Sequence, residues 1–249
     1  MPADMGNAES DDIASGPRGD RTQHVASPGI IDRGSGMQRR LARFAGLAAL
    51  VVAAVSFALN GSVPGNGSSG AEASAWFSAH AGRHVIASWC GGIAVLALFW
   101  FFLAVRDRVQ GHGEDALTAA SSMLGLVVVT LLLLGNVPIM AGAMTADARD
   151  LPLPPASAEV FLHLGIGAYL MMVIAFGGYL ILLGIAMLRS ATLPRLLGYL
   201  SIAGGAVALL PYAGFLGFAA VLPLWIIAMT VWLQRTDAPT RSVAHPISP

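Results

Sequence analysis

The apolar residues of this chain gather in long runs, and nearly all of its charged residues lie between those runs. From residue 41 onward, stretches of about 18 residues or more carry few or no charges, which is the length that a helix needs to cross a bilayer core of about 30 Å. The pattern predicts an all-α, polytopic membrane protein, a bundle of six transmembrane helices. The predicted spans cover residues 41–59, 84–105, 118–142, 160–188, 196–210 and 215–233.

The last two spans share one charge-free stretch, residues 196–234. A single helix of that length would measure about 58 Å, which is close to two crossings of a bilayer core. Pro211 removes a backbone donor and Gly214 permits a turn, so we place the break between the two spans there.

Both ends of the chain are polar. Residues 1–38 mix Asp, Glu and Arg with Gly, Ser, Pro and Ala, and without a long apolar run we expect them to form a disordered tail. A cleaved secretory signal is not expected, because the first apolar run follows this polar segment and is long enough to span a membrane. The chain then divides into the tail 1–38, a transmembrane domain 39–235 and a short tail 236–249.

Composition supports this class. Of the 249 residues, 55% are hydrophobic and only 11% are charged, against about 25% in a soluble domain, which argues against a water-soluble globule. The 14 basic residues, all arginine, balance 14 acidic ones, so the chain has no basic surface for nucleic acid. Cys90 is the single cysteine, which excludes an intramolecular disulfide and a cysteine-based zinc site.

The arginines predict the orientation of the bundle. By the positive-inside rule, the face with more arginines near the helix ends is cytoplasmic. We therefore expect both termini in the cytoplasm, and the loops 60–83 and 144–158 and the Pro211 turn outside. The predicted inner face carries Arg33, Arg39, Arg40, Arg43, Arg106, Arg108, Arg189, Arg195, Arg235 and Arg241, and the outer face carries Arg83 and Arg149.

The first outer loop contains a helix-start signal. Ser69 and Glu72 have the spacing of a capping box, which predicts a short helix over the residues that follow. We expect this helix to lie on the membrane with Trp76 and Phe77 inserted.

Small residues recur four positions apart in three of the predicted spans. Such strips allow two helices to approach closely, so we expect them to pack inside the bundle, with a homo-oligomer face or a cavity wall as the alternative. The pairs are Ala87/Gly91, Ser88/Gly92, Ser121/Gly125, Ser201/Gly205 and Gly204/Ala208.

The middle of every predicted span lacks Asp, Glu and Arg, which argues against an ion-coupled pump or a voltage sensor. Asn136 is the most informative polar residue there, because Pro138 frees a carbonyl in the preceding turn. We expect the protein to bind a lipid or a small hydrophobic molecule in an outward-facing pocket between the second, third and fourth spans, with Asn136 and Tyr212 as candidate residues. An uncoupled small-molecule transporter is the alternative, and it would need a polar path between the two faces.

Three histidines and a glutamate form a second candidate site at the outer face. His80 and His84 are four residues apart, as are Glu159 and His163, so each pair shares one face of a helix. Together they could bind zinc or copper, and His84 with His163 could hold a haem if the second and fourth spans are adjacent. The competing interpretation, which we favour, is an interfacial hydrogen-bond cluster without a cofactor.

The chain carries none of the common nucleotide-binding, zinc-protease or serine-hydrolase motifs, and we assign no catalytic residue. Three short segments carry a resemblance: residues 41–47 read LARFAGL, residues 76–83 read WFSAHAGR and residues 193–200 read LPRLLGYL. Over about residues 39–235 the chain resembles an uncharacterised family of six-span bacterial membrane proteins, a domain-of-unknown-function group common in actinobacteria. The resemblance implies a six-span fold in the bacterial plasma membrane and assigns a role to no residue.

Overall fold

The protein, a computed structural model, is described over residues 32–65, 67–110, 116–149, 151–190, 194–210 and 214–235. Over these ranges it is helical and contains no strand, which confirms the predicted all-α class. The predicted tail residues 1–31 and 236–249 lie outside the described ranges. The helices are α1 (Asp32–Asn60), α2 (Gly70–Ala79), α3 (Ala81–Gln110), α4 (Ala116–Arg149), α5 (Pro155–Arg189), α6 (Arg195–Ala208) and α7 (Gly214–Arg235).

Four helices are long and apolar enough to cross a membrane, namely α3, α4, α5 and the segment Gly217–Gln234 of α7. The two other predicted spans correspond to shorter apolar helices, Phe44–Asn60 within α1 and the whole of α6. With 14 residues, α6 measures about 21 Å, which is less than the thickness of a bilayer core. Six full crossings are therefore not supported.

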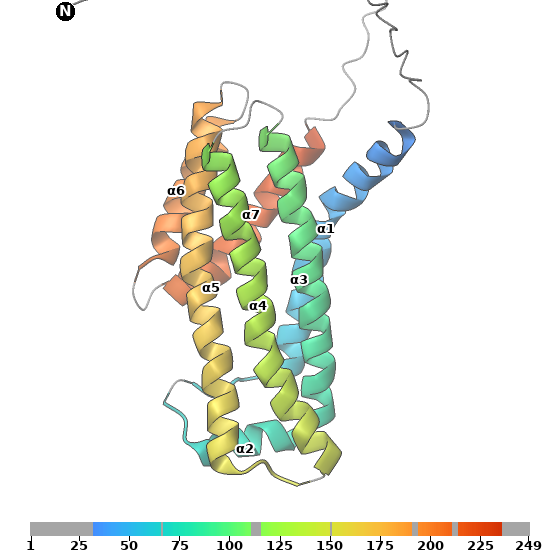
Figure 1. The fold of residues 1–249 in the computed structure, drawn as a ribbon, viewed down its shortest axis with the longest axis vertical. Coiled ribbons are helices and arrows are strands. Elements are labelled where there is room, and N and C mark those ends of the chain that lie inside the picture. Colours follow the sequence, from blue (N-terminus) through green and yellow to red (C-terminus); the bar gives the residue numbers. More distant parts are fainter. Residues whose placement is uncertain are drawn as a thin grey trace, which may run out of the picture.

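The helices other than α2 pack in a ring. In order, α1, α3, α4, α5 and α6 lie side by side, and α7 packs against both α6 and α1 (Figure 1). We call one end of the bundle, at the top in Figure 1, the arginine end, because α3 and α5 end there and α6 begins there with Arg108, Arg189 and Arg195. The opposite end, which α2 covers, is called the α2 end.

Large apolar side chains cover the outside of the bundle. On α3 they follow a helical stripe of Trp89, Ile93, Leu96 and Trp100, each about half exposed or more. Similar exposed residues lie on α1, α4, α5, α6 and α7. A continuous apolar surface of this kind is unfavourable in water and favourable in a bilayer. Together with the four long apolar helices, it marks a membrane-embedded protein.

The hairpin of α6 and α7 reaches only halfway along α5. A Cβ added to Gly177 would lie 2.8 Å from Leu209 Cγ, and a Cβ added to Gly214 would lie 3.6 Å from Val173 Cγ1. Val173 and Gly177 are in the middle of α5, and Figure 1 shows the hairpin beside the upper half of that helix. The two helices on either side of the predicted Pro211 turn therefore end at mid-depth and do not reach the α2 end. The six-span prediction requires that they do, so it is not supported for these two helices.

Aromatic side chains fill the arginine half of the bundle. Trp225 of α7 lies edge-on to Phe101 of α3 and Tyr179 of α5, at ring-centroid distances of 5.9 and 5.8 Å. Its indole Nε1 donates a hydrogen bond of 3.0 Å to the Ser201 hydroxyl of α6. One tryptophan thus joins four helices through packing and a single polar contact.

The short helix α2 forms where the capping box predicts it. The Ser69 hydroxyl accepts from the Glu72 amide, and the Glu72 carboxylate accepts from the Ser69 amide at 2.8 Å. Phe77, however, does not insert into the membrane as predicted. It is fully buried, and a Cβ on Gly142 of α4 would lie only 2.7 Å from its ring. Because Gly142 has no side chain, the phenyl ring fits between helices, and α2 becomes part of the bundle.

The small-residue strips are used for close packing within the chain. A Cβ on Gly125 would lie 3.3 Å from the Tyr179 ring, and one on Gly204 would lie 2.7 Å from Val221. A Cβ on Gly92 would meet nothing within 4 Å. A homo-oligomer through any of these faces stays a prediction.

Candidate functional site

His84 is buried near the start of α3, with an exposed fraction of 3%. Its Nε2 lies 3.0 Å from the Trp76 carbonyl oxygen, and its Nδ1 lies 3.2 Å from Asn60 Oδ1. A backbone carbonyl oxygen only accepts, so Nε2 carries the hydrogen and donates. The side-chain amide of Asn60 can be turned over by 180°, since its nitrogen and oxygen are assigned from their contacts, and neutral His84 then accepts at Nδ1 from the Asn60 amide nitrogen. Both ring nitrogens therefore have partners within the protein.

Arg83 holds the end of α1. Its guanidinium donates from Nη2 to the Ala58 carbonyl at 2.9 Å and from Nε to the Leu59 carbonyl. Carbonyls in the last turn of a helix lack partners within the helix, and a cation there is also favoured by the helix dipole. The sequence identified Arg83 only as one of the arginines of the predicted outer face, so its contact with the end of α1 was not predicted.

The other three residues of the predicted histidine cluster lie nearer the surface. His80 is exposed at the C-cap of α2, Glu159 is exposed near the start of α5, and His163 is half-buried one turn further on. Among the residues that the structure describes, no three His, Cys, Asp or Glu side chains come together so as to hold a metal ion.

At the α2 end, α4 lies between α3 and α5. Asn136 of α4 contacts Ser88 of α3, and Gly135 of α4 faces Gly165 of α5. The haem alternative assumed that the second and fourth spans are adjacent at this depth, and the third span instead separates them. The described residues therefore offer no observation that favours a metal or haem site.

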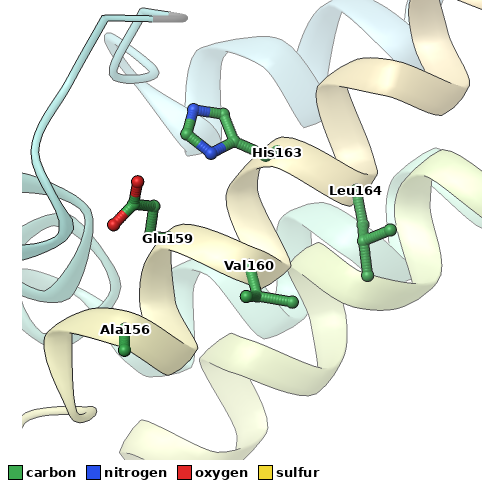
Figure 2. Close-up of a pocket in the computed structure, with 5 residues that line it drawn as sticks. All are labelled: Ala156, Glu159, Val160, His163 and Leu164. Atoms are coloured by element: carbon green, nitrogen blue, oxygen red, sulfur yellow. The ribbon is translucent and has the colours of Figure 1, made fainter.

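Glu159 and His163 line an open groove on α5 (Figure 2). The groove has a volume of about 520 Å³, is widely open, and is lined by five residues of this one helix, Ala156, Glu159, Val160, His163 and Leu164. Ala156, Val160 and Leu164 are four residues apart and form an apolar stripe. Figure 2 shows the Glu159 carboxylate and the His163 ring on the same side of the helix. The groove is thus amphipathic.

The start of α2 lies beside Glu159. A Cβ on Gly70, the first residue of α2, would lie 3.1 Å from Glu159 Oε2. The positive end of the α2 dipole at this position favours the negative charge of the carboxylate. Glycine at position 70 is what permits the close approach.

Asn136 forms a polar contact in the α2 half of the bundle. Its Nδ2 donates to the Ser88 carbonyl at 2.7 Å. A Cβ on Gly91 would lie 3.3 Å from Asn136 Oδ1 and 3.4 Å from the Ser56 hydroxyl. The Ser88 hydroxyl is buried and has no hydrogen-bond partner in the described part of the chain, which is uncommon, since a buried polar atom without a partner costs about 1–3 kcal/mol.

Several residues at the level of Asn136 are only partly buried. On α3, Gly91 lies on the same face as the buried residues Ala87 and Leu98 and is itself partly exposed. Leu132 and Asn136 of α4 and Tyr169 of α5 are also partly buried. The space beside Gly91 is occupied by the Asn136 amide and the Ser56 hydroxyl.

Sequence reasoning found Asn136 but missed Gly91, Ser56 and Ser88 as its neighbours. The other predicted pocket residue, Tyr212, lies outside the described ranges. Comparison of the chain with protein-family models, with curated proteins and with solved structures finds no match.

Proposed function

We propose that this protein is an integral protein of the bacterial plasma membrane that binds a lipid or another small hydrophobic molecule beside Asn136. The observation that carries the proposal is the buried Ser88 hydroxyl, which has no hydrogen-bond partner in the described part of the chain, next to the partly exposed Asn136 and Gly91. A buried polar atom without a partner is uncommon. A polar group of a ligand bound beside Asn136 would supply that partner.

The residues around Asn136 indicate the chemistry of the ligand. The partly exposed side chains of Leu132 and Tyr169 nearby suit an apolar body. The Asn136 Oδ1 near Gly91 can accept a hydrogen bond, and the Ser88 hydroxyl can donate or accept one. Binding sites for small apolar molecules commonly combine an apolar wall with a few such polar groups. We therefore propose a ligand with a long apolar part and one hydroxyl or carbonyl group.

The proposed orientation follows from the arginine distribution. Arg108, Arg189 and Arg195 lie toward the arginine end, which we place in the cytoplasm by the positive-inside rule. A labelling experiment tests this orientation: Cys90 is replaced by Ala, and a cysteine is introduced at Val63 in the exposed loop before α2. A membrane-impermeant maleimide should label Val63→Cys in intact cells. Labelling only after lysis would reverse the orientation.

The binding proposal is tested with a photoreactive probe, a long-chain alcohol that carries a diazirine in its chain. The wild-type protein in a bilayer should be cross-linked within the peptides that contain Leu132, Asn136 or Tyr169. Gly91→Leu should abolish the cross-links, because a Cβ there already lies 3.3 Å from Asn136 Oδ1 and the leucine side chain would block access to that amide. Gly92→Leu is the matched control, since a Cβ at Gly92 meets nothing within 4 Å. Cross-links that persist in Gly91→Leu, or that are lost equally in Gly92→Leu, would overturn the proposal.

A further inference from the structure

One face of α5 is covered along half of its length and open along the other half. The covered half faces α6. A Cβ added to Gly184 of α5 would lie 2.7 Å from the Gly198 carbonyl oxygen of α6, and a Cβ added to Gly205 of α6 would lie 2.6 Å from the Gly177 carbonyl oxygen of α5. Leu170, His163 and Glu159 lie on the same face of α5 as Gly184 and Gly177, nearer the α2 end, because residues seven or four positions apart share one face of a helix. Leu170 and Glu159 are exposed and His163 is half-exposed. The open half therefore continues the face on which α6 packs.

The depth of this open face follows from α3 and its contacts. The charge-free part of α3 between His84 and Arg106 has a length of about 33 Å, which matches a bilayer core. Near the arginine side, Phe102 of α3 lies against Tyr179 of α5 with ring centroids 4.7 Å apart. Tyr179 is therefore inside the core on that side, whereas Glu159 is 20 residues further toward the α2 end, about 30 Å along the helix. This places Glu159 at the opposite membrane–water interface and Val173 near the middle of the bilayer.

The open face is thus as long as one leaflet is deep. From Glu159 to Ile174, which is 53% exposed, α5 rises by about 22 Å. At one end lies Leu209 at the end of α6, and at the other lies the amphipathic groove with Glu159 and His163 (Figure 2). A polar end at the interface followed by an apolar path to mid-membrane matches a single lipid molecule standing in one leaflet.

The charge at the polar end selects the headgroup. Glu159 is exposed, and its carboxylate lies beside the start of α2. The apolar stripe of Ala156, Val160 and Leu164 leaves Glu159 and His163 as the polar lining of the groove. A carboxylate accepts strong hydrogen bonds from an ammonium group, whereas it repels an anionic headgroup. We propose that this face of α5 binds a phospholipid with a primary-amine headgroup, with the ammonium group at Glu159 and an acyl chain running past Leu170 to the tip of α6.

This site differs from the one proposed beside Asn136, because it uses the outward side of α5 instead of the side that faces α4. It is tested by native mass spectrometry of the purified full-length protein, titrated with phosphatidylethanolamine or with phosphatidylglycerol of the same acyl chains. The wild-type protein should bind the first lipid more tightly, by about fivefold, the size expected for a partly exposed ionic contact. Glu159→Gln should remove this preference.

Two further variants make the result specific. Asp147→Asn is the matched control, because Asp147 is an exposed carboxylate on α4 at the same end of the bundle, and it should keep the preference. Gly167→Phe should weaken binding of both lipids, because a Cβ there meets nothing within 4 Å and the ring can enter the open face without disturbing the fold. Equal binding of both lipids by the wild-type protein, or equal losses in Asp147→Asn and Glu159→Gln, would overturn the proposal. A dimer that excludes both lipids would also overturn it and would identify a second copy of the chain as the occupant.

Discussion

Gly177 of α5 and Gly205 of α6 bring two helix backbones into direct contact: a Cβ added to Gly205 would lie 2.6 Å from the Gly177 carbonyl oxygen. Seven residues away along each helix, Gly184 and Gly198 repeat the contact, since a Cβ on Gly184 would lie 2.7 Å from the Gly198 carbonyl oxygen. Small residues at such contacts allow van der Waals packing over the length of both helices, the main source of helix association in membranes. This paired contact fixes the position of the α6–α7 hairpin along α5.

The first prediction concerns this contact. Gly205→Ala should destabilise the protein by about 1–3 kcal/mol, because the obstructing atom belongs to the backbone and the helices must move apart. Thermal unfolding in detergent measures the effect. Gly167→Ala is the control on α5: with nothing within 4 Å of its Cβ, it should leave stability unchanged or raise it by about 0.5–1 kcal/mol. Equal melting temperatures of the two variants would contradict the proposed helix contact.

The second prediction concerns α2. Phe77→Ala should release α2 from the bundle, because Phe77 is fully buried against Gly142 and removal of a buried phenyl group costs about 3–5 kcal/mol. Hydrogen exchange should then accelerate within Gly70–Ala79 while α3 to α5 stay protected. Val63→Ala, in the exposed loop before α2, should exchange like the wild type. Unchanged protection of α2 in Phe77→Ala would show that the phenyl ring does not hold the helix.

The third prediction concerns the protonation of His84. Since its Nε2 lies 3.0 Å from the Trp76 carbonyl oxygen, the hydrogen of the neutral ring should reside on Nε2. Nitrogen chemical shifts of the imidazole in labelled protein distinguish the two tautomers. His84→Ala should lower stability by about 1–3 kcal/mol by leaving buried partners unsatisfied, whereas His80→Ala at an exposed position should stay within about 0.5 kcal/mol. The Nδ1–H tautomer in the wild type would contradict the assigned contact.

The fourth prediction concerns the end of α1. Arg83→Gln should cause the last turn of α1 to fray, since the guanidinium binds the carbonyls of Ala58 and Leu59. The loss of stability should be small, about 1 kcal/mol, because the contact is exposed. Faster hydrogen exchange just after Asn60 is the direct measurement, and Arg106→Gln at the opposite end of α3 is the control. Exchange that changes equally in both variants would rule out a local role.

Much of the secondary structure follows from the spacing of charges. The predicted span at residues 160–188 lies within α5, Pro155–Arg189, because uncharged length predicts a helix directly. The capping box at Ser69 predicted α2 for a similar local reason, since its two hydrogen bonds join residues three apart. The candidate site was less accessible: Glu159 and His163 share a groove as their spacing suggests, but His84 belongs to a separate contact with Trp76 and Asn60.

The sequence by itself determined the helical class, the positions of the apolar helices and the capping of α2, because these depend on residues near one another along the chain. Only the tertiary structure decided that the α6–α7 hairpin stops at Val173, that Phe77 is buried, and that Asn136 contacts Ser88 and Gly91. Hydropathy reports the length of an apolar segment, but it does not report which neighbour the segment packs against or at what depth. Those outcomes depend on the shapes of the packed surfaces, for example on which glycines face each other across two helices. A one-dimensional pattern of apolar and polar residues does not contain that information.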